Sequence, residues 1–188
     1  MTFLKLLSAG ARKKDKLFSV CVPARVKTIS DDTFSYPKIA ELSDRVMIMA
    51  YDEHWSTSLP GPIASVSWCE KIAGYALTVI PPEKLVMGLP FYGRSWANEK
   101  TAQGWYFSGI NRIIDQYDSD KVEYINDIPT VRIKMKVDVI CWFEDTYSTV
   151  QKLRLYTSRG ISSAAFWRIG QEDPAVWQWI TLLEKENP

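Results

Sequence analysis

DRVMIMAYDEHW at residues 44–55 and KLVMGLPFYGRSW at residues 84–96 share one pattern. Each begins as a short apolar run, which is typical of a strand buried on both faces of a parallel sheet. Each ends in polar and aromatic side chains: Tyr51, Asp52, Tyr92 and Arg94. Residues 64–80 between them are long enough for the crossover helix that parallel strands require. The two segments therefore predict a βαβ unit.

The polar residues at the ends of these two runs are the first candidates for a functional site. Barrels of parallel strands place their chemistry at the carboxyl ends of the strands. Tyr51 and Asp52 should therefore lie at the same rim as Tyr92 and Arg94 and form half of an active site. Structural explanations stay open, because a Tyr-Asp pair also suits a turn and Met49 on a strand also suits a core.

The rest of the chain alternates between strand and helix patterns. Strands are predicted at 17–22, 137–143 and 161–167, and helices at 3–10, 37–42, 110–117, 145–159 and 175–185. A hairpin is predicted between 122–125 and 131–135. This order predicts an α/β fold that is about half of an eight-stranded βα barrel, with a small α+β insertion before the last strand. We divide this truncated domain into 1–96, the insertion 97–136, and 137–188.

Composition narrows the classes of function. The chain has a net charge of +1 from 23 basic and 22 acidic residues, so nothing indicates nucleic-acid binding. No run reaches the roughly 18 apolar residues of a membrane span. Three cysteines without C-x-x-C spacing predict buried free thiols, and we expect neither a metal site nor a cofactor. Eight tryptophans and nine tyrosines indicate that some aromatic side chains line a groove.

A half barrel also poses a problem of unpaired strand edges. Its inner face is apolar, and its two outermost strands expose unpaired backbone donors and acceptors that can pair with another strand. We therefore expect the chain either to self-associate through these edges or to require a missing amino-terminal half-barrel.

Three motifs in order resemble glycoside hydrolase family 18, the chitinase-like family that includes peptidoglycan-cleaving glucosaminidases. They are MAYD at 49–52, GLPFYGRSW at 88–96 and AAFW at 164–167, and they fit the sixth, seventh and eighth barrel strands of that family. LFSVCVPA at 17–24 fits the fifth, so the resemblance implies barrel strands 5 to 8. CWFED at 141–145 resembles the spore-cortex branch of the family.

The resemblance implies substrate-assisted hydrolysis of β-1,4-linked N-acetylglucosamine polymers, in which the sugar's own acetamide attacks the anomeric carbon. In this scheme the Tyr51 hydroxyl donates to the acetamide carbonyl oxygen, and Asp52 hydrogen-bonds the sugar near the scissile bond. The remaining residues would bind substrate: Met49 at the pocket floor, Trp167 under the sugar ring, and Tyr92 and Arg94 along the groove.

One feature of the family is missing from this sequence. The motif DxxDxDxE, whose glutamate is the family's general acid, does not occur, so we expect the isolated chain to be inactive. Glu144 is a conceivable substitute, although a carboxylate in the first turn of a helix explains it better. Two alternatives stay open: a non-catalytic sugar-binding relative, or an unrelated βα-barrel enzyme. The sequence does not distinguish chitin from peptidoglycan. Family membership would imply an extracellular, cell-wall or spore location for the parent protein.

Overall fold

The computed structural model describes residues 2–97, 107–117, 122–125, 128–131, 136 and 139–181. These residues divide into two compact units, one of residues 1–95 with 141–188 and one of residues 96–140. The first unit contains a four-stranded sheet with the order β1-β2-β3-β8. Its strands are β1 Ser19–Pro23, β2 Arg45–Met49, β3 Leu85–Pro90 and β8 Ser163–Trp167.

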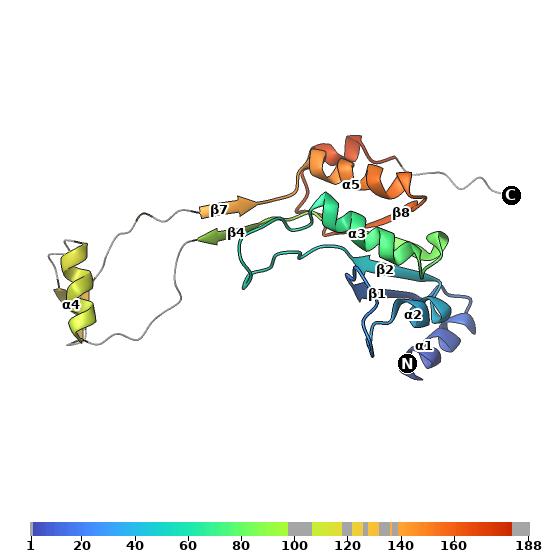
Figure 1. Cartoon of the computed structure of the whole chain (residues 1–188), viewed down its shortest axis with the longest axis horizontal. Helices are drawn as coiled ribbons and strands as arrows, with labels where there is room; N and C mark the ends of the chain where they lie inside the picture. Colours follow the sequence, from blue (N-terminus) through green and yellow to red (C-terminus); the bar gives the residue numbers. More distant parts are fainter. Residues whose placement is uncertain are drawn as a thin grey trace. The chain divides into compact units, whose positions relative to one another are not determined.

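All neighbouring strands of this sheet run parallel (Figure 1). Val46 pairs with Val20 on one side and with Leu85 on the other, and Gly88 pairs with Ala165. The insertion separates β3 from β8 in sequence, yet the two are neighbours in the sheet. The predicted α/β half barrel is therefore confirmed, as an open sheet of four parallel strands.

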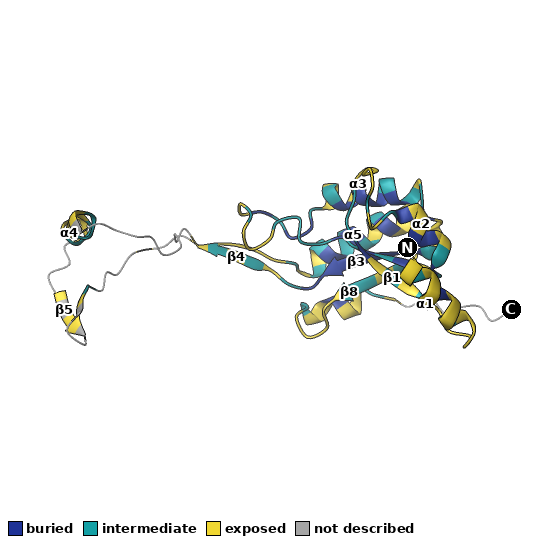
Figure 2. Ribbon diagram, turned by 90° about the horizontal axis from the view of Figure 1, so that it is seen from below, coloured by how far each residue is buried: buried dark blue, intermediate teal, exposed yellow. Residues whose placement is uncertain are grey.

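Helices cover one face of the sheet (Figure 2). They are α2 Tyr36–Leu42, α3 Val66–Leu77 and α5 Thr146–Ser158, and α1 Thr2–Arg12 packs beside α2. Helix α3 begins where the Ser65 side chain accepts a hydrogen bond from the Trp68 amide, which satisfies a free donor of the first turn. Its buried residues recur at helical spacing: Cys69, Ile72, Ala73 and Ala76. They pack on Val46, Ile48, Leu85 and Met87 in the main core.

The opposite face of the sheet carries the alternate residues of each strand. Met47 and Met49 are partly exposed, whereas Val46 and Ile48, which alternate with them, are fully buried. This alternation is the signature of a strand with one covered face. Cys21 lies on the open face beside Met47 and is exposed, as is Cys141. The prediction of three buried thiols is therefore wrong for these two, because the strand periodicity points Cys21 away from the helices.

The buried thiol of Cys69 gives a direct test of this arrangement. Burial raises the pKa of Cys69 to about 11, and only the thiolate reacts quickly with alkylating reagents. We expect iodoacetamide at pH 8 to modify Cys21 and Cys141 in the native protein and to spare Cys69 until the chain is unfolded in urea. Peptide mass spectrometry measures this, and rapid native labelling of Cys69 would contradict the described packing.

The second unit is small. It contains α4 Phe107–Gln116 and a hairpin of β5 Val122–Ile125 with β6 Ile128–Val131. The helix and the first hairpin strand are as predicted, but the second strand starts three residues earlier than expected, because Ile125 pairs directly with Ile128. The predicted turn residues and residues 132–135 lie outside the described ranges. Two strands, β4 Arg94–Ala97 and β7 Val139–Trp142, form a further two-stranded sheet.

The carboxyl-terminal region differs from its prediction. A 3₁₀ helix, η2 Pro174–Gln178, stands where a helix over 175–185 was expected. Trp179 closes this turn, and residues 182–188 lie outside the described part of the chain. The side chain of Asp173 caps the turn by accepting from the Ala175 amide. This local bond stabilises a single tight turn at the position where Pro174 starts it.

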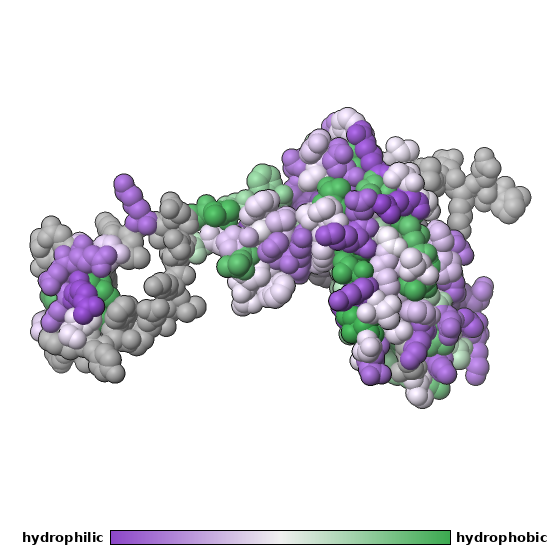
Figure 3. All heavy atoms as spheres, in the orientation of Figure 1, coloured by the Kyte–Doolittle hydropathy of each residue, from purple (hydrophilic) through white to green (hydrophobic). Residues whose placement is uncertain are grey.

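The surface of the helical side is mixed in character. Hydrophilic residues are spread over it, with smaller hydrophobic areas between them (Figure 3). Among the described residues, none of the helices has the length and hydrophobicity needed to cross a bilayer.

Candidate active site

Asp52 is the centre of the polar group that follows β2. Its Oδ1 accepts a hydrogen bond from the Tyr92 hydroxyl at 2.7 Å and two from Arg94, from Nη2 at 2.7 Å and from Nε at 3.2 Å. The backbone of Asp52 has a φ of 60°, a left-handed conformation that aspartate tolerates better than most residues. The predicted convergence of the two strand ends is therefore present in the structure.

The arrangement leaves part of the Asp52 carboxylate available. All hydrogen bonds to this side chain that come from described residues end on Oδ1. Its Oδ2 can therefore accept a bond from a sugar hydroxyl or amide, while Arg94 and Tyr92 hold the carboxylate in place. The bond to Asp52 raises the pKa of Arg94. Burial, and then the same carboxylate, raise the pKa of Tyr92, so its phenol stays protonated as a donor.

Tyr51 stands beside this group, with its ring at 76° to that of Tyr92 and the two ring centroids 6.3 Å apart. Its ring also lies against Gly88, where a Cβ atom would approach Tyr51 Cε1 to 3.2 Å and the Ile48 carbonyl oxygen to 2.7 Å. Glycine at this position of β3 thus makes room for the ring. Burial raises the pKa of Tyr51, and no hydrogen bond from the described residues engages its hydroxyl. Within the described part of the chain the phenol is therefore a protonated donor that no other group engages.

A pocket of about 320 Å³ opens at this end of β1 and β2, a size at the lower end of small-molecule sites. Its lining comes from both strand ends and from α3: Pro23, Ala24, Met49, Tyr51, Asp52 and Trp68. Met49 therefore lines the pocket together with the two predicted catalytic residues. Trp68 was missed from the sequence, because its position in the first turn of an amphipathic helix gives no signal beyond ordinary packing.

Trp167 ends β8 at the same edge of the sheet but does not line this pocket. It is 55% exposed and lies two residues beyond Ala165, the partner of Gly88. Because side chains alternate along a strand, Trp167 shares the open face with Gly88 and with the Tyr51 ring that covers it. A flat indole on this face can extend the surface offered to a sugar, and its role as a stacking platform stays a prediction.

The two remaining acids near strand ends have structural partners. Glu53 accepts a hydrogen bond from the Ser65 amide at 2.7 Å and thereby fixes the loop between β2 and α3. Glu144 is buried and pairs with Lys152 of α5 at 2.5 Å. Glu144 lies one residue before the N-cap residue Asp145. The prediction that it is a carboxylate in the first turn of the helix is therefore wrong, because the helix starts after it. The sequence did not indicate that Lys152 is buried, because a lysine within a helix is usually exposed to solvent.

These features agree with the comparison to known families. The model of the glycosyl hydrolases family 18 matches residues 1–172. The chain belongs to this family. The match includes β1, β2, β3 and β8, and with them all six residues of the predicted site.

Individual relatives are distant and longer. The chain is 25% identical to the uncharacterized glycosylase YvbX of Bacillus subtilis strain 168, over 95% of this chain and 54% of that protein. It is 26% identical to the cortical fragment-lytic enzyme of Bacillus anthracis, over 79% of this chain and 36% of that enzyme. The chain thus spans about half or less of the length of these relatives.

A solved structure shows the same fold. The family 18 chitinase of Cycas revoluta, crystallised as a mutant in complex with (GlcNAc)4, superimposes with a TM-score of 0.64 at 21% identity. The match covers 93% of this chain and 60% of that one. At this level of identity the likeness extends to the arrangement of strands and helices only.

The sequence contains no DxxDxDxE motif. The nearest approach is DQYDSDKVE at residues 115–123, where the glutamate stands one position too late. This segment starts in helix α4, within the unit of residues 96–140, and not after a strand of the parallel sheet.

Proposed function

We propose that this chain supplies the carboxyl-terminal half of an active site that hydrolyses β-1,4-linked N-acetylglucosamine polymers with retention of configuration. The observation that carries the proposal is the joint presence of a free Tyr51 phenol and an Asp52 carboxylate held on one oxygen by Tyr92 and Arg94. A donor and a fixed acceptor at the mouth of one pocket match the two polar ends of an acetamido sugar.

The reaction that this geometry suits is substrate-assisted. The acetamide oxygen of the sugar attacks its own anomeric carbon, the bond to the leaving oxygen breaks, and a general acid protonates that oxygen. Tyr51 donates to the acetamide oxygen and orients it for attack, while Asp52 Oδ2 hydrogen-bonds the same sugar beside the scissile bond. Water then attacks the anomeric carbon and breaks its bond to the acetamide oxygen, while the deprotonated general acid takes the proton of the water and is restored. The general acid comes from a glutamate outside this chain.

The partner that completes the site is a complementary half-barrel. β1 and β8 are the outermost strands of the sheet among the described residues, so their outer edges and the open sheet face need cover. The relatives are about twice the length of this chain or longer. We favour an amino-terminal half-barrel over a second copy of this chain, because only the former supplies the missing acid. The substrate is then chitin or peptidoglycan, and the site of action is the cell wall or spore, as the name of the cortical fragment-lytic enzyme suggests.

Binding of N-acetylchitotetraose to the purified chain tests the saccharide site directly. We expect Tyr51→Phe and Trp167→Ala each to raise the dissociation constant by roughly 10-fold or more. The first variant removes a hydrogen bond and the second a stacking surface, and each such interaction contributes about 1–3 kcal/mol. Isothermal titration calorimetry gives the constants.

Trp179→Ala is the matched control. Trp179 is 60% exposed, close to the 55% of Trp167, but it lines two hollows of about 450 and 490 Å³ along the outer side of α5. We expect this variant to bind like the wild type. Loss of binding in Trp179→Ala with none in Tyr51→Phe would contradict the proposal and place the saccharide on α5.

A further inference from the structure

A buried ion pair lies behind the candidate site and plays no part in the chemistry above. Lys152 and Glu144 have side chains that are 2% and 6% exposed, and their charged atoms are 2.5 Å apart. The Ser148 hydroxyl donates to the same carboxylate oxygen at 2.7 Å. A buried pair of this kind gains little stability over apolar residues of similar volume. Its presence at this position therefore calls for another role.

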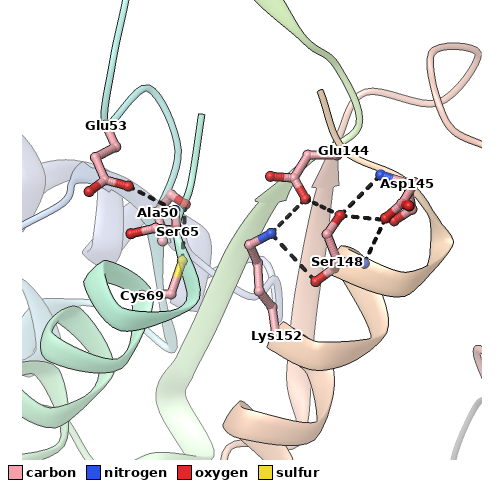
Figure 4. Close-up of polar contacts among 8 residues, drawn as sticks. All are labelled: Ala50, Glu53, Ser65, Cys69, Glu144, Asp145, Ser148 and Lys152. Atoms are coloured by element: carbon pink, nitrogen blue, oxygen red, sulfur yellow. Dashed lines mark hydrogen bonds and ion pairs between the residues drawn. The ribbon is translucent and has the colours of Figure 1, made fainter. Parts of the chain in front are cut away.

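The pair fixes the chain segment that leads from β7 into α5 (Figure 4). Glu144 directly follows Trp142 and Phe143, and these two lie against Gly93. A Cβ atom at Gly93 would be 2.6 Å from both Phe143 Cβ and the Trp142 carbonyl oxygen. Only a glycine permits this approach, so any shift of the 142–144 segment changes the space available to the backbone at Gly93.

Gly93 stands between the two residues that hold Asp52. Tyr92 and Arg94 flank it in sequence, and both donate to Asp52 Oδ1. The ion pair thus connects to the site through three contacts. Lys152 binds Glu144, the two residues before Glu144 contact Gly93, and the two neighbours of Gly93 in sequence donate to Asp52.

The same buried region reaches Tyr51 from the other side. The Cys69 thiol of α3 donates to the carbonyl oxygen of Ala50, the residue before Tyr51, at 3.8 Å. Helix α3, which carries Cys69, packs against helix α5, which carries Lys152. The supports of both halves of the site therefore come from two neighbouring helices.

We propose that Glu144 and Lys152 are positioning residues, which hold Tyr92 and Arg94 in register with Asp52 and so set the affinity of the saccharide site. The inference rests on the proposed function for its ligand. It extends that function to two residues that touch no substrate, Lys152 on α5 and Glu144 just before it.

The double variant Glu144→Leu/Lys152→Met tests positioning apart from folding. Removing both partners leaves no buried charge, so the protein should fold, but the side-chain bonds from Glu144 to Lys152 and Ser148 of α5 are then lost. We expect the chemical shift of the Arg94 Nε–H resonance, recorded in ¹H–¹⁵N spectra without ligand, to move away from the value that the hydrogen bond to Asp52 gives it. We also expect the dissociation constant of N-acetylchitotetraose to rise by about 10-fold or more, as for other misplaced sites.

Two controls separate this role from simple loss of stability. Ile161→Ala removes a buried side chain after the far end of α5, and should lower stability while leaving the Arg94 resonance and the affinity unchanged. Arg159→Gln breaks an exposed pair with Glu70 between the same helices α3 and α5 and should change neither. A double variant that folds with the wild-type Arg94 resonance would overturn the proposal. If the wild type binds no saccharide, the proposed function fails, and the resonance still decides positioning.

Discussion

Replacing Lys152 with methionine is expected to lower the free energy of unfolding by about 3–5 kcal/mol, since it leaves an unpaired charge in a buried site. Glu144 is 6% exposed and would keep only the Ser148 hydroxyl and the few remaining dipoles around it. Urea unfolding followed by tryptophan fluorescence measures the change as a shift of the midpoint at constant slope.

The double variant and an exposed pair are the controls for this result. Glu144→Leu/Lys152→Met should recover most of the lost stability, because both desolvated groups are gone. Arg159→Gln breaks a pair whose side chains are 34% and 51% exposed, and such pairs contribute at most about 1 kcal/mol. A Lys152→Met protein within about 1 kcal/mol of the wild type would show that Glu144 finds another partner or water.

Turnover is expected only when a second segment supplies the general acid. The purified chain should hydrolyse a chromogenic N-acetylglucosaminide about 10²–10⁴-fold more slowly than the same chain co-purified with an amino-terminal half-barrel carrying DxxDxDxE, because a general acid contributes a factor of this size. Release of the chromophore gives the rate. Light scattering should show a one-to-one complex of the two segments.

The control for this experiment is the same half-barrel with glutamine in place of its acidic glutamate. This partner should bind the chain equally well and leave the rate at its low level. Turnover by the isolated chain would disprove the assignment of the acid to another segment. A complete complex that binds N-acetylchitotetraose without hydrolysing it would favour the alternative of a non-catalytic sugar-binding barrel.

The local pattern of the sequence was sufficient for the parallel strands and for the rim. Apolar runs at 46–50 and 85–89 became β2 and β3, because the central strands of a parallel sheet are rich in apolar residues. The chain direction then placed Tyr51 and Asp52 at the same edge as Tyr92 and Arg94. The residues that hold Asp52 were thus predictable from strand ends alone.

Elements with weaker patterns were predicted less well. The strand partner of β5 was displaced by three residues, and β4 was not expected, because short strands outside the main sheet depend on pairing and not on burial. Cys21 was expected inside, although its strand has one open face.

The sequence by itself determined the family, the order of the parallel strands and the polar residues at their ends, since each of these follows from a motif or from local periodicity. Only the tertiary structure decided that Lys152 is buried against Glu144 and that Gly93 touches Trp142 and Phe143. The insertion separates Gly93 from Trp142 and Phe143, and eight residues, about two turns of helix, separate Glu144 from Lys152. The packing of α5 against the segment before it brings them together, and no pattern within one element encodes such packing.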